Sequence, residues 1–400
     1  MEYKYVARDT GGRRVTGVIE APNPRVVARE LRSQGLYPLS VAPKRPGLTI
    51  PLPFLDRVPL KQVALFTRQV AAMIGSGIPL PAALGTVAEQ VKNKRLRQVL
   101  RDVKEMVEGG EKFSEALSKY PKVFDRLFIS MVEAGEATGN LDVMLNRYFT
   151  YVEKVLALRR KVVTAMVYPT VVLVLAIGIV AFLLIKIVPT FTALFKEAGV
   201  ELPALTLFII NLSTFLKTNF VYIFWGLVAF FALFRFSLRN ENVRRAYDRV
   251  KLRMFVIGPL FRKVSVARFS RTLATMVKSG IPILDALDII AKTSGNKVIE
   301  EAVLKARLEV ARGESLSKTL KELGVFPSMV VEMMAAGEQT GALDEMMDKV
   351  ADFFEDEVDA AVAALTSILE PLMLIFLGGF IGLIVIALYL PIFKMAATIK

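Results

Sequence analysis

Cysteine and histidine are both absent from the 400-residue chain, and tryptophan occurs once. The missing thiols and imidazoles exclude disulfides, thiolate nucleophiles, zinc sites with cysteine or histidine ligands, and imidazole acid–base catalysis. The sequence also lacks a Walker GxxxxGK[ST] loop and a GxSxG elbow. Carboxylate chemistry and oxygen-ligated Mg²⁺ or Ca²⁺ sites remain open. The composition therefore argues against most enzyme classes, and we expect no cofactor.

We also expect no secretory signal, because residues 1–10 are polar and contain no apolar core. Hydrophobic residues nevertheless make up 54% of the chain, and mean hydropathy is +0.46. Charged residues still account for 22%, with a formal net charge of +14. This combination indicates water-soluble domains attached to a few membrane spans. We expect the first of these spans to act as the insertion signal.

Three apolar runs are long enough to cross ~30 Å of hydrocarbon as helices. They occupy residues 166–190, 219–237 and 368–392. The middle run is the shortest and is rich in aromatic residues, which favour the membrane interface. The sequence therefore predicts three transmembrane helices.

Lysine and arginine are distributed unevenly around these runs, and this bias sets the orientation. Residues 191–218 carry only Lys196 and Lys217, whereas residues 235–268 carry ten basic residues. We therefore expect the basic flanks in the cytoplasm. The expected cytoplasmic segments are residues 1–165 and 238–367, and the expected external segments are the loop 191–218 and the tail 393–400.

An internal repeat dominates the rest of the sequence. Residues 66–84 match residues 269–287 at ten of nineteen positions, and residues 131–142 match residues 333–344 at eight of twelve. Each repeat unit is a domain of ~110 residues followed by a span. The middle span is not repeated. We interpret it as the segment that returns the chain to the cytoplasm for the second copy.

Helical periodicity and Gly or Pro punctuation divide each copy into six helices, with the sixth running into the membrane. In copy one the fifth helix is expected to end near Gly135. The predicted fold is mainly α, with two cytoplasmic six-helix bundles on three transmembrane helices. The two bundles occupy residues 60–165 and 259–367, and residues 238–258 form a basic connector.

The first 42 residues follow a different pattern. Alternating residues on either side of Gly11-Gly12 predict a β-hairpin, and a helix and a third strand follow. This predicts a small α+β domain over residues 1–42. Five prolines then mark residues 43–59 as a stiff linker.

The motifs together resemble the type II secretion F family. The similarity lies in the leading YKYVARDTGGRRVTGVIEA segment, the repeated FTRQ…GSGIPL and GE-x-TG-x-LD blocks, and the three-span arrangement. It covers essentially the whole chain. Each short block alone is weakly specific, but the ordered set occurs twice.

The resemblance implies a non-enzymatic assembly platform in the bacterial inner membrane, for a type IV pilus or a type II secretion pseudopilus. Its implied partners are a cytoplasmic hexameric ATPase for assembly or retraction, major and minor pilins or pseudopilins, and other inner-membrane alignment proteins. The N-terminus would be cytoplasmic and the C-terminus periplasmic. We also expect a homo-oligomer and contact with anionic lipid, but no binding to nucleic acid.

The sharpest motif is GE-x-TG, which contains Glu136 in copy one and Glu338 in copy two. One interpretation is a helix–turn–helix corner, in which glycine ends one helix and Glu136 accepts N–H bonds at the start of the next. The alternative is a docking corner for the ATPase. A weak divalent-cation site formed with Glu133 and Asp142 is a further alternative.

Two X-Pro pairs lie where the repeated spans begin, Tyr168-Pro169 and Glu370-Pro371. Each proline removes an N–H, so both helices are expected to loosen at the same depth. A carboxylate near lipid is costly unless it is hydrated or faces protein. Glu370 is therefore either an interfacial carboxylate or a contact for a neighbouring subunit or a pilin helix.

Two further features suggest contacts. The basic patch Arg159-Arg160-Lys161 either anchors the chain to anionic lipid or pairs with the acidic residues 355–359 of the second copy or another subunit. Gly378 and Gly382 form a small-residue stripe in the third span, which permits close helix approach in an oligomer.

Two other functions compete with the platform. A three-span transporter or channel subunit is the first alternative, although the spans contain no pairs of opposite charge. A membrane-tethered signalling or DNA-binding protein is the second, suggested by the net charge. However, the basic residues cluster beside the spans and follow the topology, which favours lipid.

Overall fold

The computed structural model of the chain contains two compact units, Met1–Arg57 and Val58–Lys400. The described residues are 2–8, 14–21, 24–33, 35–43, 58–197, 202–255 and 257–398. The predicted Gly11-Gly12 turn and nearly all of the predicted proline-rich linker lie outside them.

The small unit is the predicted α+β domain. Its elements are β1 (Glu2–Arg8), β2 (Arg14–Glu20), α1 (Pro24–Ser33) and β3 (Tyr37–Pro43). The sheet is antiparallel in the order β2-β1-β3, and the β1–β3 register shifts between Val6 and Ala7. Val27 and Leu31 of α1 are fully buried in a small core with Tyr3.

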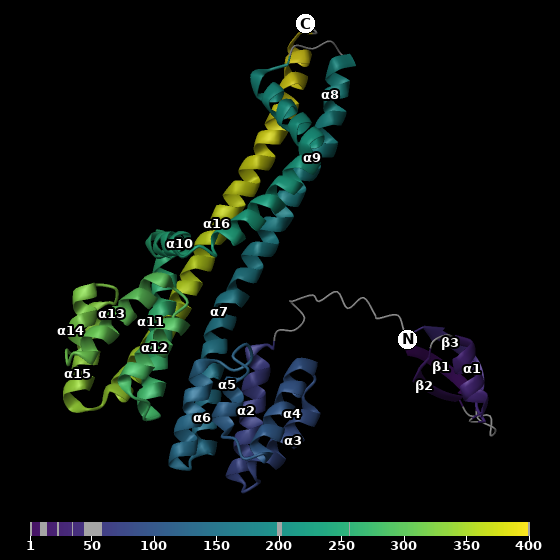
Figure 1. Cartoon of the computed structure of the whole chain (residues 1–400). Helices are drawn as coiled ribbons and strands as arrows, with labels where there is room; N and C mark the ends of the chain where they lie inside the picture. The colour runs from purple at the N-terminus through teal and green to yellow at the C-terminus, as the bar shows by residue number, and fades with distance from the viewer. Residues whose placement is uncertain are drawn as a thin grey trace. The chain divides into compact units, whose positions relative to one another are not determined.

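The large unit contains the two predicted six-helix copies, in the same order of elements (Figure 1). Copy one consists of α2 (Leu60–Gly75), α3 (Leu80–Gln90), α4 (Lys94–Glu108), α5 (Phe113–Ser118), α6 (Arg126–Thr138) and α7 (Leu141–Phe182). Copy two consists of α11 (Gly258–Lys278), α12 (Ile283–Thr293), α13 (Lys297–Ala311), α14 (Leu316–Leu323), α15 (Ser328–Thr340) and α16 (Leu343–Thr398).

Side-chain caps fix where several of these helices begin. The side chains of Asn93, Asp125 and Asn296 each accept a hydrogen bond from a backbone N–H two or three residues further on. These bonds satisfy donors that a helix start leaves without partners. The corresponding stop signal is a left-handed glycine, with φ of 73° at Gly139 and 71° at Gly341.

Aromatic side chains fill the centre of each bundle. In copy one Phe66, Phe128 and Tyr148 are fully buried, and the rings of Phe128 and Tyr148 lie 4.7 Å apart. In copy two Phe269 and Phe326 are 4.5 Å apart. Burial of these large rings, together with the surrounding aliphatic side chains, holds each bundle together.

The sixth helix of each copy continues without a break from the bundle into an apolar segment. α7 passes through a π-helical turn, η1 (Leu183–Ile187), into α8 (Val188–Glu197). The unrepeated α9 (Ala204–Ser237) and α10 (Glu241–Arg253) then lead to copy two. Three helical stretches of the described chain, those containing α7, α9 and α16, are long and apolar enough to cross a membrane.

The segment 191–218, expected as a loop, is helical over most of its length. α8 extends to Glu197, and α9 begins at Ala204. Phe195 and Ile209 in this segment are buried against Ile384 of α16. The helical conformation places these apolar side chains where they can pack on α16. The sequence pattern alone did not reveal α16 as their partner.

Candidate functional site

The glutamate of the GE-x-TG motif closes the start of a neighbouring helix. In copy one, Glu136 on α6 accepts hydrogen bonds from the N–H groups of Phe113, at 2.6 Å, and Ser114, at 3.2 Å. The Ser114 hydroxyl also donates to it, at 2.5 Å. The expected helix-corner role is therefore corrected in one respect, because Glu136 caps α5 and not the following α7. The first N–H groups of a helix have no partner within the helix, and Glu136 supplies one for α5.

Copy two repeats this arrangement at Glu338. Its carboxylate accepts bonds from the N–H of Leu316, at 2.7 Å, and the N–H of Ser317, at 3.2 Å. The hydroxyls of Ser315 and Ser317 also donate to it, at 2.7 and 2.5 Å. Partial burial opposes ionisation, but these bonds outweigh it and lower the pKa of Glu338.

The first glycine of the motif does not end a helix, contrary to the expectation for Gly135. α6 continues to Thr138, and Gly139 ends it. A Cβ added at Gly135 would lie 3.0 Å from the Cα of Leu141, and the equivalent distance at Gly337 is 2.8 Å. Glycine is needed here because the backbones of successive helices pass close together.

The predicted cation ligands do not converge. Both oxygens of Glu136 are already occupied by α5. Asp142 lies beside Gly75 at the end of α2. Among the described residues, no group of three or more carboxylate, histidine or cysteine side chains is placed to hold a metal ion.

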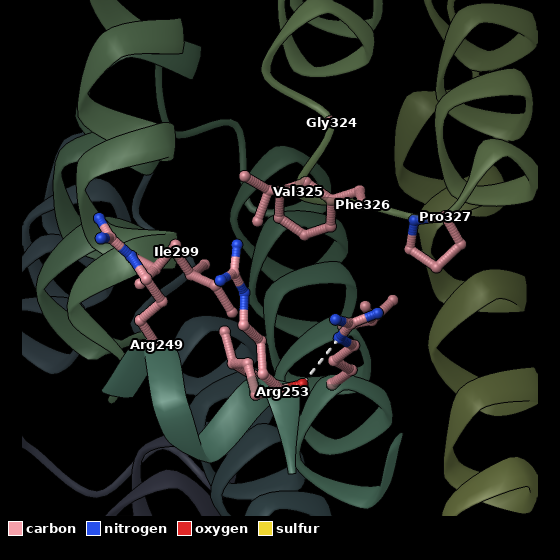
Figure 2. Close-up of a pocket in the computed structure, with 11 residues that line it drawn as sticks. Arg249, Arg253, Ile299, Gly324, Val325, Phe326 and Pro327 are labelled. Carbon is pink, nitrogen blue, oxygen red and sulfur yellow. Dashed lines mark hydrogen bonds between the residues drawn. The ribbon is translucent and has the colours of Figure 1, made fainter. Parts of the chain in front are cut away.

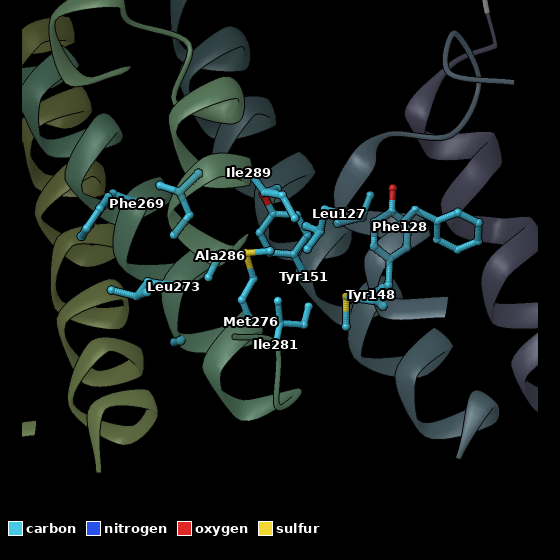
Figure 3. Packing of buried hydrophobic residues seen from close by; sticks show 14 of the residues in the cluster. Leu127, Phe128, Tyr148, Tyr151, Phe269, Leu273, Met276, Ile281, Ala286 and Ile289 are labelled. Carbon is cyan, nitrogen blue, oxygen red and sulfur yellow. The ribbon is translucent and has the colours of Figure 1, made fainter. Parts of the chain in front are cut away.

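The two copies pack against each other through α7, which contacts both α11 and α16. Tyr151 of α7 is buried in this repeat interface, and its hydroxyl lies 3.2 Å from that of Thr272 on α11. Figure 3 shows its ring close to Met276 and Ala286 of copy two. The residue equivalent to Tyr151 in copy two, Phe353, is 45% exposed. The contact between the copies is therefore head-to-tail: the surface around Tyr151 on α7 is covered by copy two, whereas the equivalent surface around Phe353 on α16 is not covered by copy one.

A buried arginine organises the copy-two side of the interface. The side chain of Arg271 is only 4% exposed and forms ion pairs with three carboxylates of α16, those of Asp348, Asp352 and Glu355. Lys154 of α7 also reaches Asp352, at 3.0 Å. Partial burial would raise the pKa of Asp352, but the hydrogen bonds from Arg271 and Lys154 lower it. One carboxylate thus joins the two copies.

The basic patch of copy one contributes to the same interface. Lys161 pairs with Asp359 of copy two at 2.5 Å, within one chain. This matches the predicted pairing with the acidic residues 355–359. No ion pair of Arg159 or Arg160 is found among the described residues, and both side chains are exposed.

Hydroxyl groups on α9 bind the two repeated spans at equivalent depths. Pro391 has no N–H for the carbonyl of Ala387, and the buried Thr206 hydroxyl donates to that carbonyl at 2.5 Å. In the first repeated span, the N–H of Val188 at the start of α8 bonds to the carbonyl of Leu183 in the π-turn η1. The carbonyl of Leu184 instead accepts a hydrogen bond from the buried hydroxyl of Ser213.

The prolines explain this arrangement. Pro189 and Pro391 occupy equivalent repeat positions, and each removes one helical donor. An unpaired carbonyl is costly in hydrocarbon, so a hydroxyl from a neighbouring helix takes the place of the missing N–H. Thr206 and Ser213 are seven residues, or two turns, apart on one face of α9. The sequence pattern did not reveal these two hydroxyls, because nothing local distinguishes them from exposed ones.

The other predicted contacts face outward in the single chain. Tyr168, Glu370 and Pro371 are exposed, whereas Pro169 is buried. Both helices continue through their prolines at these positions. A Cβ added at Gly378 or Gly382 would meet no atom within 4 Å. Apart from Pro169, these residues are therefore available to lipid or to a partner.

Two fused copies of a six-helix bundle, each continuing into an apolar helix, define a class of duplicated membrane proteins with water-exposed helical domains. The model of the family "Type II secretion system (T2SS), protein F" matches residues 66–189 and 269–391, and the model of its N-terminal domain matches residues 1–42. The chain belongs to this family.

Curated relatives span nearly the whole chain. A type IV pilus assembly protein PilC from Thermus thermophilus is 47% identical over 402 residues, covering 100% of this chain and 99% of the relative. A protein of the same name from Myxococcus xanthus is 43% identical, covering 100% and 96%. A type II secretion system protein F from Vibrio cholerae is 37% identical, covering 98% of each.

Replacing Glu338 with alanine should lower the free energy of unfolding by about 1–2 kcal/mol at pH 7, as for loss of a helix cap. The lowered pKa of Glu338 makes this contribution complete above the unfolded value of about 4.3, and it disappears as pH falls through the folded value. Thermal unfolding of the detergent-solubilised chain, followed by circular dichroism, measures the loss. The control is Glu332→Ala, at an exposed position of the same helix. Equal effects of the two variants would contradict the capping role.

Replacing Gly337 with alanine should destabilise copy two by about 1–3 kcal/mol, because the new Cβ meets backbone that cannot yield. Gly378→Ala is the matched control, because its Cβ enters open space, and its effect should stay within ~0.5 kcal/mol. The same unfolding measurement distinguishes them. A neutral Gly337→Ala would show that the close backbone approach is not required.

Replacing Thr206 with valine removes the hydroxyl with little change of shape and leaves the Ala387 carbonyl without its donor. We expect a loss of about 1 kcal/mol. Unfolding in mixed detergent and SDS micelles would measure it. Thr214→Val is the control, because that exposed hydroxyl bonds only within its own helix, to Ile210. If both variants unfold alike, the hydroxyl of Thr206 does not tie α9 to α16.

Proposed function

We propose that this chain is a non-enzymatic assembly platform in the bacterial inner membrane for a type IV pilus or a type II secretion pseudopilus. The names and full-length similarity of its relatives support this role. Both bundles lie in the cytoplasm in this proposal, as the basic flanks indicate. A cytoplasmic ATPase acts on them, and pilin subunits leave or re-enter the bilayer beside the spans.

The observation that carries the proposal is the unbroken path from bundle to membrane. α7 and α16 each run from a bundle core into an apolar span without a loop. Because the repeat interface joins both helices at Asp352, a displacement of either bundle moves both helices together. A rigid coupling of this kind transmits a tilt or rotation through the bilayer, which suits a protein that converts ATPase strokes into pilin movement.

A transporter role receives less support. The cleft between the first and third spans is apolar, and its lining offers no ligand for an ion or a polar solute. Its lining residues are Leu173, Ala176, Leu372, Met373, Ile375 and Phe376.

The test is a flexible break in α7 between the repeat interface and the span. Inserting Gly-Gly-Ser after Thr164 leaves the ion pair of Lys161 intact but interrupts the rod. In cells lacking the native gene, this variant should reach the membrane in normal amounts yet restore less than about a tenth of the surface filaments or secreted protein, since the stroke no longer reaches the span.

The same insertion after Gly47, in the predicted proline-rich linker, is the control and should restore function. Normal filaments from the Thr164 insertion would refute the coupling mechanism. A wild-type chain that restores neither filaments nor secretion would refute the proposed function itself.

A further inference from the structure

The helix α10, which joins the middle span to copy two, exposes an apolar stripe. Val243, Tyr247, Val250 and Met254 are all exposed, although each is apolar or aromatic. They are spaced by four, three and four residues, so at ~100° per residue they share a sector of ~60°. Phe255 follows directly and is 95% exposed.

The opposite face of α10 is fixed to the bundle of copy two. The buried carboxylate of Asp248 accepts a bond from the N–H of Lys297, at 2.8 Å, in the first turn of α13. Arg245 pairs with Glu301 at 2.8 Å. These groups are ~140–200° from Val243 around the helix. The stripe therefore faces away from the bundle and is not covered by it.

The position of α10 relative to the middle span places the stripe at the membrane surface. α9 ends at Ser237, only three residues before α10 begins. The ring of Tyr247 packs edge-to-face on Phe234, 5.7 Å away, in the last turns of the span. In Figure 1, α10 lies across the end of the copy-two bundle. Tyr247 thus shares the depth of the end of the span.

Arginine side chains lie beside the stripe and line a cavity. Arg249 and Arg253 lie on one edge of α10 and, with Arg262 of α11, line a cavity of about 510 Å³. Figure 2 shows Arg253 reaching toward Val325 and Phe326. Arg262 donates to the Leu252 carbonyl, at 3.1 Å, which holds it in place. Within the described part of the chain, none of the three arginines forms an ion pair with a carboxylate.

We propose that α10 is an interfacial helix whose apolar stripe enters the headgroup–acyl boundary and whose arginine-lined cavity binds the phosphate of an anionic phospholipid. An apolar face flanked by arginine is the pattern of helices that lie in the bilayer surface. The apolar walls suit the glycerol and the first methylenes of a lipid. Since Asp248 fixes α10 to α13, the lipid surface sets the orientation of copy two. The inference requires only that α9 crosses a bilayer.

Because the chain contains no cysteine, a single introduced thiol reports on one position. The full-length variant Val250→Cys, carrying an environment-sensitive fluorophore, is reconstituted in nanodiscs that contain shallow brominated lipid. Leu308→Cys on α13 is the control, because the native side chains are similarly exposed, at 60% and 55%. Lipid-borne bromine should quench the Val250 label at least ~3-fold more than the Leu308 label, as insertion at the interface requires. Equal quenching would overturn the proposal.

The charge component is tested with Arg249→Ala/Arg253→Ala against Lys305→Ala/Lys321→Ala, which removes two exposed charges elsewhere in copy two. Mass spectrometry of the full chain from nanodiscs with mixed phosphatidylglycerol and phosphatidylcholine measures the bound lipid ratio. The preference for phosphatidylglycerol should fall about fivefold for each arginine removed and should not change in the lysine control. An equal loss of phosphatidylglycerol preference in the two double variants would overturn the proposed lipid site. Binding of inorganic phosphate or nucleotide with no lipid preference would also overturn it.

Discussion

The buried guanidinium of Arg271 is the interaction on which the rest of the large unit depends. A charge that is almost fully buried is tolerated only when carboxylates surround it, and here all three lie on one face of α16. This requirement fixes the rotation of α16 against α11. Asp352 is then held where Lys154 of α7 can reach it. The relative position of the two copies, and of the two long helices, follows from that arrangement.

The duplication has diverged at this point. Arg68 is the copy-one equivalent of Arg271, but its guanidinium lies 5.1 Å from the ring of Phe149. Asn146 and Thr150 stand where copy two has Asp348 and Asp352. Copy two therefore carries the acidic surface and copy one the lysines that meet it. Divergence of charge explains why two copies of one fold join head-to-tail.

The packing of the apolar spans follows from a similar requirement, that buried polar groups have partners. Prolines at equivalent positions of two spans remove donors, and hydroxyls of α9 supply them. The unrepeated helix is therefore more than a return segment, because it binds both repeated spans. Together with α10 at the membrane surface, it connects the position of the bundles to the position of the bilayer.

The sequence by itself determined the repeat, the six helices of each copy, the three spans, the small α+β domain and the family. These depend on local periodicity, on apolar length and on motif order, which are readable along one chain. The fifth helix of copy one was expected to end near Gly135, but it ends at Gly139. A glycine needed for close packing and a glycine needed for a turn look alike in sequence.

Only the tertiary structure decided which groups are partners. Glu136 caps α5, which lies 22 residues earlier, and Thr206 bonds to Ala387, 181 residues later. Nothing local distinguishes such residues from solvent-exposed polar ones, because burial and hydrogen bonding arise only when distant helices pack. For the same reason Glu133, Glu136 and Asp142 appeared to form one cluster in sequence, whereas in the fold Glu136 caps α5 and Asp142 lies beside Gly75.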